Sequence, residues 1–395
     1  MAISPKPAST KNNIGQGATT GARYLQSLND DREIWYQGER IKDVTNHPQL
    51  QQMAQSLARI YDMQHEAATK NVMTYLREDG LRISYSYCAP QNSQDLLNRR
   101  ANTEVWVREV FGMCGRLPDF CSSMVIGYYD IKDELAKLDA ELGNNTESYF
   151  TYASTNDLCL SHTLHDPSMD KSLRPSQDPD RCVRVVKERD DGVIVRGARF
   201  NTLGLFSNEI LVSPTYLLTE DEPEFAIWFT IPTSTPGLKQ IARELFSGRD
   251  PVDHPASTRF DEVDSLVIFD DVFVPWERVF LYRQPLASNR LFRSNVMTWA
   301  SYTSTIQTQL RMEILISTAH LLAQTSGMDK KPNVIAALGE MCTYLSLLRS
   351  SLRVSEIDCV RTPGGHIAPK PTPENRALVT IISERFVELL EHIGT

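Results

Sequence analysis

The sequence lacks the features that would assign it to a membrane, secreted or nucleic-acid-binding class. Its 395 residues contain no apolar run near the roughly 18 residues that span a bilayer. The opening segment MAISPKPASTKNNIGQGATT has no apolar centre of a secretory signal, and residues 1–19 instead predict a flexible arm. The net charge of −9 argues against a basic surface for nucleic acid or anionic lipid. We therefore expect a cytoplasmic protein with neither a nucleic-acid nor a membrane partner.

The cysteines and the short motifs exclude several common kinds of site. The seven cysteines are odd in number and scattered, and none forms a CxxC pair, so neither a disulfide framework nor a zinc site is indicated. The sequence also lacks GxGxxG after a strand, GxxxxGK[ST], GxSxG and HExxH, which mark dinucleotide, P-loop, hydrolase and zinc-protease sites. Composition and local motifs therefore indicate an α+β protein without indicating its chemistry.

The first region, residues 20–150, is predicted to be mainly helical. The segment REIWYQGERIKDV predicts a short hairpin that turns at Gln37 and Gly38. Helical spacing of apolar residues follows, and it predicts helices over residues 49–76, 93–113 and 130–142.

The second region, residues 151–285, changes to β-type patterning. The segment CVRVVKERDDGVIVRGARF predicts two strands joined by a turn at Asp190-Asp191-Gly192. Further strands are predicted over residues 209–214, 225–232 and 265–275.

The third region, residues 286–395, returns to helical patterning. Long helices are predicted over residues 297–325, 331–354 and 372–392, and together they suggest an antiparallel bundle packed on the β domain. Three such helices leave apolar stripes exposed unless a fourth helix or another subunit covers them. The bundle is therefore expected to be incomplete, which implies either a shortened chain or an oligomer.

Two segments carry residues that could form a reactive site. In GMCGRLPDF a helix is expected to end near Gly115, and Pro118 interrupts the helical pattern. Arg116 is thereby placed on a constrained turn, where its planar cation can face an anion. In LSHTLHDPSMDKSLRP, His162 could present its imidazole to a ligand. Taken alone, a surface arginine at a helix end and a structural histidine are the commoner explanations of the two segments.

Five ordered segments of the chain resemble the 4-hydroxyphenylacetate 3-monooxygenase large-component family, which includes chlorophenol hydroxylases. They are TGARYLQSLNDDREIWYQGERIKDVTNHP, GRLPDF, SHTLHDPSMDKS, DDGVIVRGAR and RFDEVDSLVIFDDVFVPWERVFLY. The resemblance implies an acyl-CoA-dehydrogenase-like fold, with an α domain, a β-barrel-like domain and a helical bundle. It also implies a homotetramer or homodimer that takes reduced FAD from a separate NAD(P)H:flavin reductase. With O2, the flavin would form a C4a-hydroperoxide that hydroxylates a phenol.

The resemblance also implies roles for individual residues. Arg116 corresponds to an arginine beside substrate and flavin, and His162 to a histidine that contacts the phenol oxygen and the flavin. Both are expected to be catalytic. The phenol-binding wall is expected to include Phe120, although the 4-hydroxyphenylacetate branch has a tyrosine there. The chlorophenol branch has a histidine base on the helix that corresponds to WASYT, residues 299–303, and this chain has none. The particular phenol therefore stays open.

Three further residues are expected to contact the flavin. Asp170 and Lys171 lie where the family has an Asp-Arg pair beside the cofactor, and Thr202 corresponds to a flavin-contacting threonine.

Two alternative functions stay open. The first is a flavin-dependent CoA-ester dehydratase with an iron–sulfur cluster, although Cys114 and Cys121 have unsuitable spacing for its ligands. The second is a shortened, catalytically impaired homologue that acts as a partner or relic.

Overall fold

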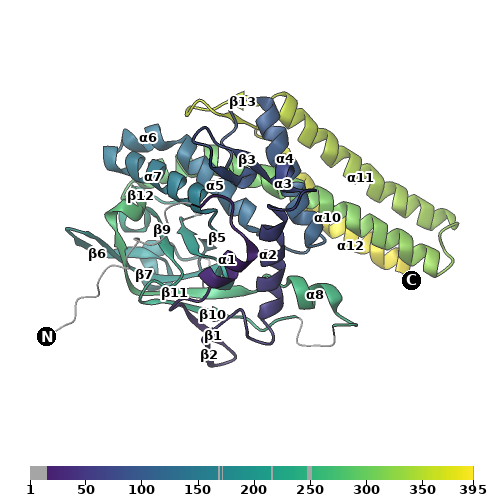
Figure 1. Ribbon diagram of the computed structural model, residues 1–395, viewed down its shortest axis with the longest axis horizontal. Coiled ribbons are helices and arrows are strands. Elements are labelled where there is room, and N and C mark those ends of the chain that lie inside the picture. The colour runs from purple at the N-terminus through teal and green to yellow at the C-terminus, as the bar shows by residue number, and fades with distance from the viewer. Residues whose placement is uncertain (1–15, 168–169, 171, 215–216, 247–250, 395) are drawn as a thin grey trace.

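The computed structural model describes residues 16–167, 170, 172–214, 217–246 and 251–394. Helices of the first half cover one side of a large sheet, and long helices of the last third extend away from it (Figure 1). The helices are α1 Gly21–Ser27, α2 Gln51–Met63, α3 Lys70–Met73, α4 Ser93–Glu109, α5 Pro118–Asp130, α6 Lys132–Ala136, α7 Ala140–Asn156, α8 Pro255–Phe260, α9 Pro285–Leu291, α10 Met297–Thr325, α11 Pro332–Ile357 and α12 Pro373–Gly394.

Ten of the described strands form one mixed sheet. Its order is β12-β9-β8-β5-β7-β11-β10-β1-β2, and β6 pairs with β7 outside this path. Two small hairpins, β3–β4 and β13–β14, stand apart from it. The strands are β1 Glu33–Tyr36, β2 Glu39–Ile41, β3 Thr74–Leu76, β4 Arg82–Ser84, β5 Leu160–His165, β6 Arg184–Arg189, β7 Gly192–Thr202, β8 Glu209–Val212, β9 Ile227–Pro232, β10 Leu238–Ala242, β11 Asp264–Pro275, β12 Val279–Tyr282, β13 Val360–Arg361 and β14 Ile367–Ala368.

Both predicted hairpins are present. Tyr36 pairs with Glu39 across the turn at Gln37 and Gly38, where both residues have positive φ. The second hairpin turns at Asp190 and Asp191, and β6 and β7 follow it in antiparallel pairing. The first hairpin belongs to the sheet, because β1 pairs in parallel with β10. The N-terminal region therefore contributes an edge of the sheet as well as helices.

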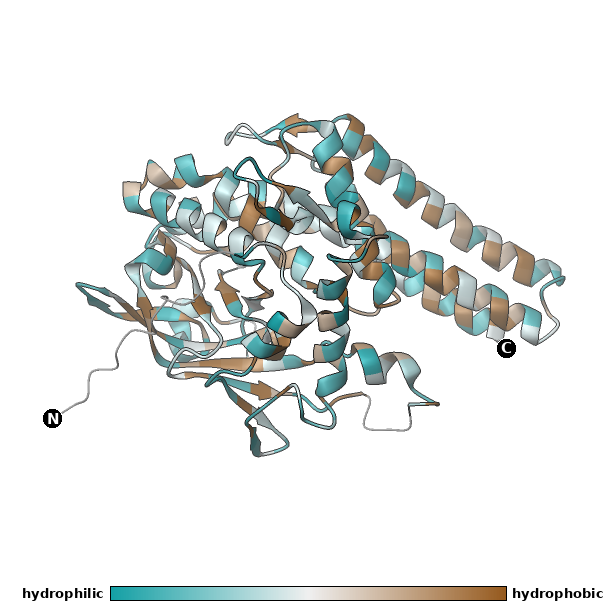
Figure 2. Cartoon of the chain, viewed as in Figure 1, coloured by the Kyte–Doolittle hydropathy of each residue, from teal (hydrophilic) through white to brown (hydrophobic). Residues whose placement is uncertain are grey.

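The three long C-terminal helices agree closely with the sequence prediction. Helices α10, α11 and α12 share an apolar core formed by Met312, Met341, Leu348, Ile382 and Phe386, among others. Hydrophobic residues recur along the whole length of these helices (Figure 2). Several large apolar side chains on their outer faces are exposed, namely Leu321, Ile335, Leu347, Val354, Ile357, Ile381 and Val387. These side chains form apolar surface that the other described elements of this chain leave exposed.

All three predicted helices of the first region are wrong in their bounds. The predicted helix 49–76 ends at Met63, and its last residues, 74–76, form strand β3. The predicted helix 130–142 is broken between α6 and α7, because the Asp139 side chain accepts a hydrogen bond from the Glu141 backbone N–H and starts a new helix. The helix predicted over residues 93–113 ends earlier, at Glu109.

Helix α5 was not predicted, although it positions the candidate site. Pro118 is its first residue and begins it, because the first turn of a helix needs no proline N–H. The helix packs against α10 and against the π-helical turn Phe292–Val296 that precedes it. At Gly127 the backbones of α5 and this turn approach so closely that an added Cβ would lie 2.8 Å from the Val296 Cα. Nearly every residue of α5 is buried, which fixes its orientation within the core.

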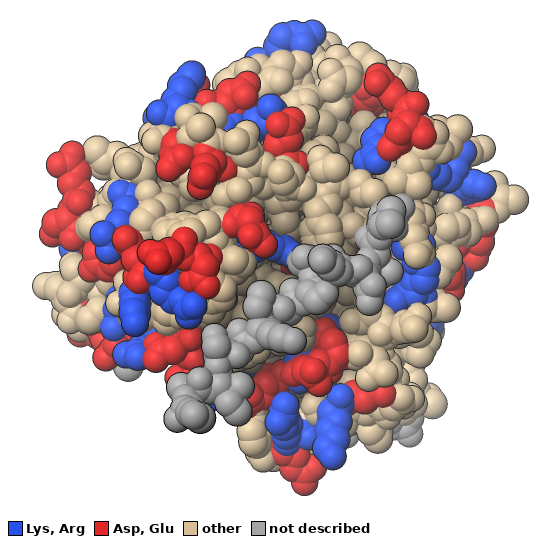
Figure 3. Space-filling model, turned by 60° about the vertical axis from the view of Figure 1, so that its left-hand side comes forward, with Lys and Arg blue, Asp and Glu red and all other residues tan. Residues whose placement is uncertain are grey.

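The surface carries charges of both signs. Figure 3 shows acidic and basic side chains interspersed over one face of the molecule. None of the helices among the described residues is long and apolar enough to cross a bilayer.

Candidate active site

Arg116, Phe120 and His162 lie together in the structure. The Arg116 guanidinium carbon lies 4.6 Å from the centre of the Phe120 ring. The His162 ring centre lies 5.3 Å from the same ring, with the two planes at 82°. One aromatic ring is therefore in contact with a cation and an imidazole from distant segments of the chain. The sequence expectation that Arg116 and His162 share one site agrees with this arrangement.

The turn that carries Arg116 is held by the part-buried carboxylate of Glu262. Glu262 Oε2 accepts hydrogen bonds from the backbone N–H groups of Gly115 at 3.0 Å and Arg116 at 2.9 Å. Burial raises the pKa of Glu262, while the Arg116 backbone hydrogen bond and positive charge act in the opposite direction. This carboxylate fixes the backbone of the turn and so determines where the guanidinium lies.

A second arginine supports the start of the same turn. Arg311 of α10 donates its Nε–H to the Gly112 carbonyl oxygen at 2.8 Å. Gly112 has a φ of +67°, and a Cβ there would lie 3.0 Å from the Arg311 Cα. The position therefore requires glycine for both its backbone conformation and its close contact with α10.

His162 is buried with unsatisfied hydrogen-bonding groups. Its side chain comes from β5, opposite Thr202 of β7. The residue is 6% exposed, and neither ring nitrogen has a hydrogen-bond partner among the described residues. Burial, assisted by the Arg116 charge, lowers the pKa of His162 to about 3. The imidazole is consequently neutral at pH 7, with one N–H donor and one acceptor nitrogen.

These features fit a bound polar ligand. A buried polar group without a hydrogen-bond partner costs about 1–3 kcal/mol, so such groups are normally satisfied by protein, water or ligand. Arg116 uses one side-chain N–H for the Gly115 carbonyl oxygen, at 3.1 Å, and its fork has further donors. A flavin edge or a phenol oxygen at this position would satisfy His162 and lie within reach of the guanidinium.

The structure places Thr202 next to His162, whereas Asp170 lies in an exposed loop. The hydroxyl of Thr202 donates to Asp264 Oδ1 at 2.7 Å, beside His162 on the sheet. Asp170 is exposed, and its Oδ1 accepts hydrogen bonds from the Ser172 N–H at 2.9 Å and hydroxyl at 2.6 Å. These contacts of Asp170 stay within its own loop. Lys171 lies outside the described residues, so the flavin roles of this pair stay predictions.

Asp119, which precedes Phe120 in α5, is a buried acid that the sequence reasoning did not select. It follows Pro118 in α5, is 1% exposed, and both carboxylate oxygens lack a geometrically good hydrogen bond among the described residues. Burial raises the pKa of Asp119 to about 7, although Thr103 and Arg99 act in the opposite direction. An aspartate at the start of a largely apolar segment is the signal that could have identified it.

Cys114 and Cys121 are separately packed thiols. Both are buried, and the Cys114 thiol donates to the Phe260 carbonyl oxygen at 3.3 Å. Within the described ranges, no group of three or more His, Cys, Asp or Glu side chains is placed to hold a metal ion. This part of the structure therefore supplies no observation in favour of the iron–sulfur alternative.

Two family models match most of the chain. The model described as 4-hydroxyphenylacetate 3-hydroxylase N terminal matches residues 20–281, and the model described as 4-hydroxyphenylacetate 3-hydroxylase C terminal matches residues 287–395. Both matches agree with the order of the motifs in the sequence.

Individual relatives and solved structures indicate the same family as the two family models. The 4-hydroxyphenylacetate 3-monooxygenase oxygenase component of Thermus thermophilus is 33% identical, over 95% of this chain and 79% of the relative. The FADH(2)-dependent monooxygenase TftD of Burkholderia cepacia is 31% identical, over 89% of this chain and 69% of the relative. A structure of the oxygenase component HpaB complexed with FAD and 4-hydroxyphenylacetate has a TM-score of 0.90 at 33% identity, covering 96% and 80% of the two chains.

A more distant structure shows the fold class alone. Glutaryl-coenzyme A dehydrogenase aligns with a TM-score of 0.51 at 11% identity, over 78% of this chain and 72% of the other. The fold is acyl-CoA-dehydrogenase-like, as expected from the motifs. Together with the matches to both family models, these likenesses place the chain in the 4-hydroxyphenylacetate 3-hydroxylase family.

Proposed function

We propose that this chain is the oxygenase component of a two-component monooxygenase that hydroxylates a phenol with reduced FAD and O2. The observation that supports it most is the cluster of Arg116, Phe120 and His162, because a cation and a neutral, unsatisfied imidazole meet at one aromatic wall. Bound reduced FAD supplies two electrons and activates O2, so that one oxygen atom can be added to the aromatic ring.

Arg116 binds and orients the phenol oxygen. Its fixed positive charge favours the phenolate over the phenol, and a phenolate ring is the better nucleophile. Glu262 holds the turn from the backbone side at 2.9–3.0 Å, so the guanidinium keeps its place without being neutralised by a direct side-chain ion pair with this acid. Arg116 therefore raises the reactivity of the ring as well as the affinity for substrate.

His162 holds the same oxygen through a hydrogen bond from its N–H. Because burial and Arg116 lower the pKa of His162 to about 3, the imidazolium form is disfavoured and the histidine is a weak proton acceptor. Its role is to orient the phenolate and to donate a hydrogen bond, with the second nitrogen available to the flavin. Phe120, which is buried, provides an apolar contact and excludes water from the ring.

The proposal extends to cofactor and partners. Thr202, Asp170, Lys171 and His162 are assigned to flavin binding, and a separate NAD(P)H:flavin reductase delivers the reduced FAD in the cytoplasm. The exposed apolar residues of α10, α11 and α12 support a homotetramer or homodimer, because contiguous apolar surface is normally covered. Size-exclusion chromatography with light scattering measures this directly, and a monomer at micromolar concentration would contradict it.

The test is turnover with a flavin reductase, NADH, FAD and a panel of phenols that includes 4-hydroxyphenylacetate. We expect a hydroxylated product from at least one phenol, and a loss of about 100-fold or more in kcat/KM in Arg116→Ala, as for removal of one charge-stabilising donor. Arg189→Ala is the matched control, because its guanidinium also lies over a phenylalanine ring, 4.7 Å from that of Phe273, but on the β6–β7 hairpin. Its activity should be unchanged.

The impaired-homologue alternative predicts a different outcome. A chain that binds no reduced FAD and forms no product from any phenol in the panel would contradict the oxygenase and favour a non-catalytic partner. Product formation that is equally fast in Arg116→Ala would remove the assigned role of the guanidinium, although the family would stand.

A further inference from the structure

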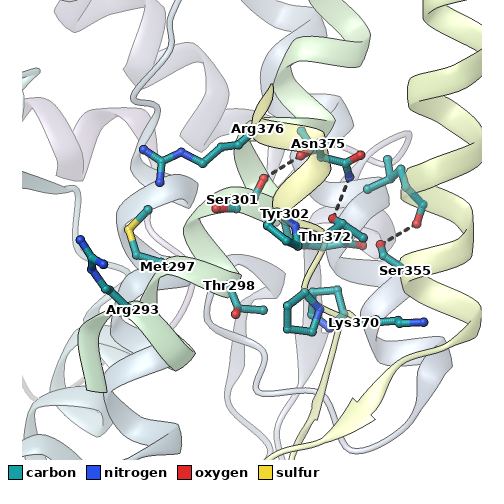
Figure 4. A pocket seen from close by; sticks show the side chains of 15 residues that line it. Arg293, Met297, Thr298, Ser301, Tyr302, Ser355, Lys370, Thr372, Asn375 and Arg376 are labelled. Atoms are coloured by element: carbon teal, nitrogen blue, oxygen red, sulfur yellow. Dashed lines mark hydrogen bonds between the residues drawn. The ribbon is translucent and has the colours of Figure 1, made fainter. Parts of the chain in front are cut away.

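A separate cavity lies where the start of α10, the end of α11 and the start of α12 meet (Figure 4). Its volume is about 220 Å³. Arg116, Phe120 and His162 are not among the residues that line it, so it is distinct from the candidate active site. Its walls are formed by Arg293, Met297, Thr298, Ser301, Tyr302, Thr305, Leu352, Ser355, Pro369, Lys370, Pro371, Thr372, Pro373, Asn375 and Arg376.

The charges that line this cavity are all positive. Arg293, Lys370 and Arg376 contribute to its wall, and no aspartate or glutamate does. Lys370 is already paired, since its Nζ lies 3.1 Å from Asp358 Oδ2, and Figure 4 shows its side chain running away from the two arginines. Neither arginine forms a side-chain hydrogen bond or an ion pair with any residue that the structure describes. Both residues are exposed, so their guanidinium N–H groups are open to water or to a ligand.

The two arginines come from different helical segments. Arg293 comes from the π-helical turn Phe292–Val296 that precedes α10, and Arg376 from the first turn of α12. Figure 4 shows both guanidinium groups on the same side of the cavity as Met297. A planar guanidinium binds a carboxylate through two parallel hydrogen bonds, and the positive end of a helix adds to the attraction.

Other lining groups leave part of the cavity polar and part apolar. The hydroxyls of Thr298 and Thr305 donate to backbone oxygens one turn earlier in the helix. For Ser301, by contrast, no side-chain hydrogen bond is formed with the described residues, so its hydroxyl can donate to a ligand. Met297, Leu352 and the prolines supply an apolar surface. An occupant with one anionic end and a compact apolar body matches this division.

We propose that this cavity binds a small organic carboxylate, with its oxygens between Arg293 and Arg376 and its apolar body against Met297 and Leu352. The volume limits the body to about one ring, since an engineered cavity of about 150 Å³ holds benzene and drug-sized ligands need about 300 Å³ or more. The occupant contacts three helices and therefore stabilises their packing. This inference does not depend on the hydroxylase proposal.

Benzoate is the probe, with benzamide as the neutral match and inorganic phosphate as the competing oxyanion. Methionine-methyl NMR on the full chain reports local binding, because Met297 lines the cavity and Met297→Leu assigns its signal. Benzoate should shift the Met297 signal saturably and raise Tm in proportion to ln(1 + [L]/Kd). Benzamide should bind at least about tenfold more weakly, because charge-assisted hydrogen bonds are about twice as strong as neutral ones.

Variants decide the assignment. Arg293→Ala and Arg376→Ala should each weaken benzoate binding about tenfold or more, as for loss of hydrogen bonds to a charged group. Lys370→Ala should change it less than about twofold, because its ammonium group is paired with Asp358. Benzoate binding that is unaltered in both arginine variants, or no saturable Met297 shift, would overturn the proposal. Tighter binding of phosphate than of benzoate would also overturn it, in favour of an inorganic oxyanion.

Discussion

The neutral state of His162 makes a quantitative prediction about stability and pH. Burial, with a further contribution from the Arg116 charge, lowers the pKa of His162 to about 3, whereas an unfolded histidine has a pKa of about 6.5. Between these values the unfolded chain binds a proton at this residue and the folded chain does not. Acid therefore favours unfolding, and the stability contributed by neutral His162 falls progressively as pH drops below about 6.5.

The magnitude follows from the two pKa values. Between pH 7 and pH 5, linkage through this one residue lowers the free energy of unfolding by about 2 kcal/mol. Other groups titrate in the same range, so the observable is a difference between two proteins. Wild type should lose about 2 kcal/mol more than His162→Gln over this interval, because glutamine is similar in size and does not titrate.

Urea unfolding at pH 7 and pH 5 measures the effect, with the ring C–H signals of His162 followed by NMR as an independent check. Equal pH dependence in the two proteins, or a His162 signal that titrates near pH 6.5, would refute a buried neutral imidazole. Arg116→Ala should move the pKa of His162 upward, since the guanidinium contributes to the shift.

Three further predictions concern buried positions elsewhere in the core. Burial raises the pKa of Asp119 to about 7, so its neutral carboxyl should stabilise the protein at acidic pH and lose that contribution as pH rises. Between pH 4 and pH 8, urea unfolding should show that wild type loses on the order of 3 kcal/mol more than Asp119→Asn. In Tyr24→Phe, loss of the 2.8 Å hydrogen bond to the Phe206 carbonyl oxygen should lower the free energy of unfolding by about 1–2 kcal/mol, and no measurable change would contradict that bond. In Gly127→Ala, the added methyl group would lie 2.8 Å from the Val296 Cα, so calorimetry should show a lower Tm and a cost of about 1–3 kcal/mol.

The elements that sequence patterning predicted are those with a clear local signal. Helices α10, α11 and α12 were located to within a few residues, because apolar residues recur with helical period over long stretches. Helix α5 was missed because it is buried on almost all sides, so its sequence PDFCSSMVIGYYD has no polar face to reveal a period. Strand β5 was missed because LSHTLH is short, and its pairing with β7 and β8 depends on segments far along the chain.

For the candidate site too, some residues could be predicted from the sequence and others depend on the tertiary fold. Arg116 and His162 came from the family motifs, and their shared contact with Phe120 is a consequence of the α5 and β5 placements. Glu262 lies in RFDEVDS, but no local pattern connects it with a turn at Gly115 that is 147 residues away in sequence. Such long-range hydrogen bonds are set by the tertiary fold rather than by neighbouring residues.

The most direct test of the oxygenase assignment is a single turnover without reductase. The chain is mixed anaerobically with one equivalent of reduced FAD and a phenol from the active panel, and oxygen is then admitted. The account predicts tight binding of the reduced flavin and formation of hydroxylated product, retained in Arg189→Ala and lost in Arg116→Ala. Failure of the wild-type chain to bind reduced FAD, or oxidation of the bound flavin with release of H2O2 and no product from any phenol, would contradict it.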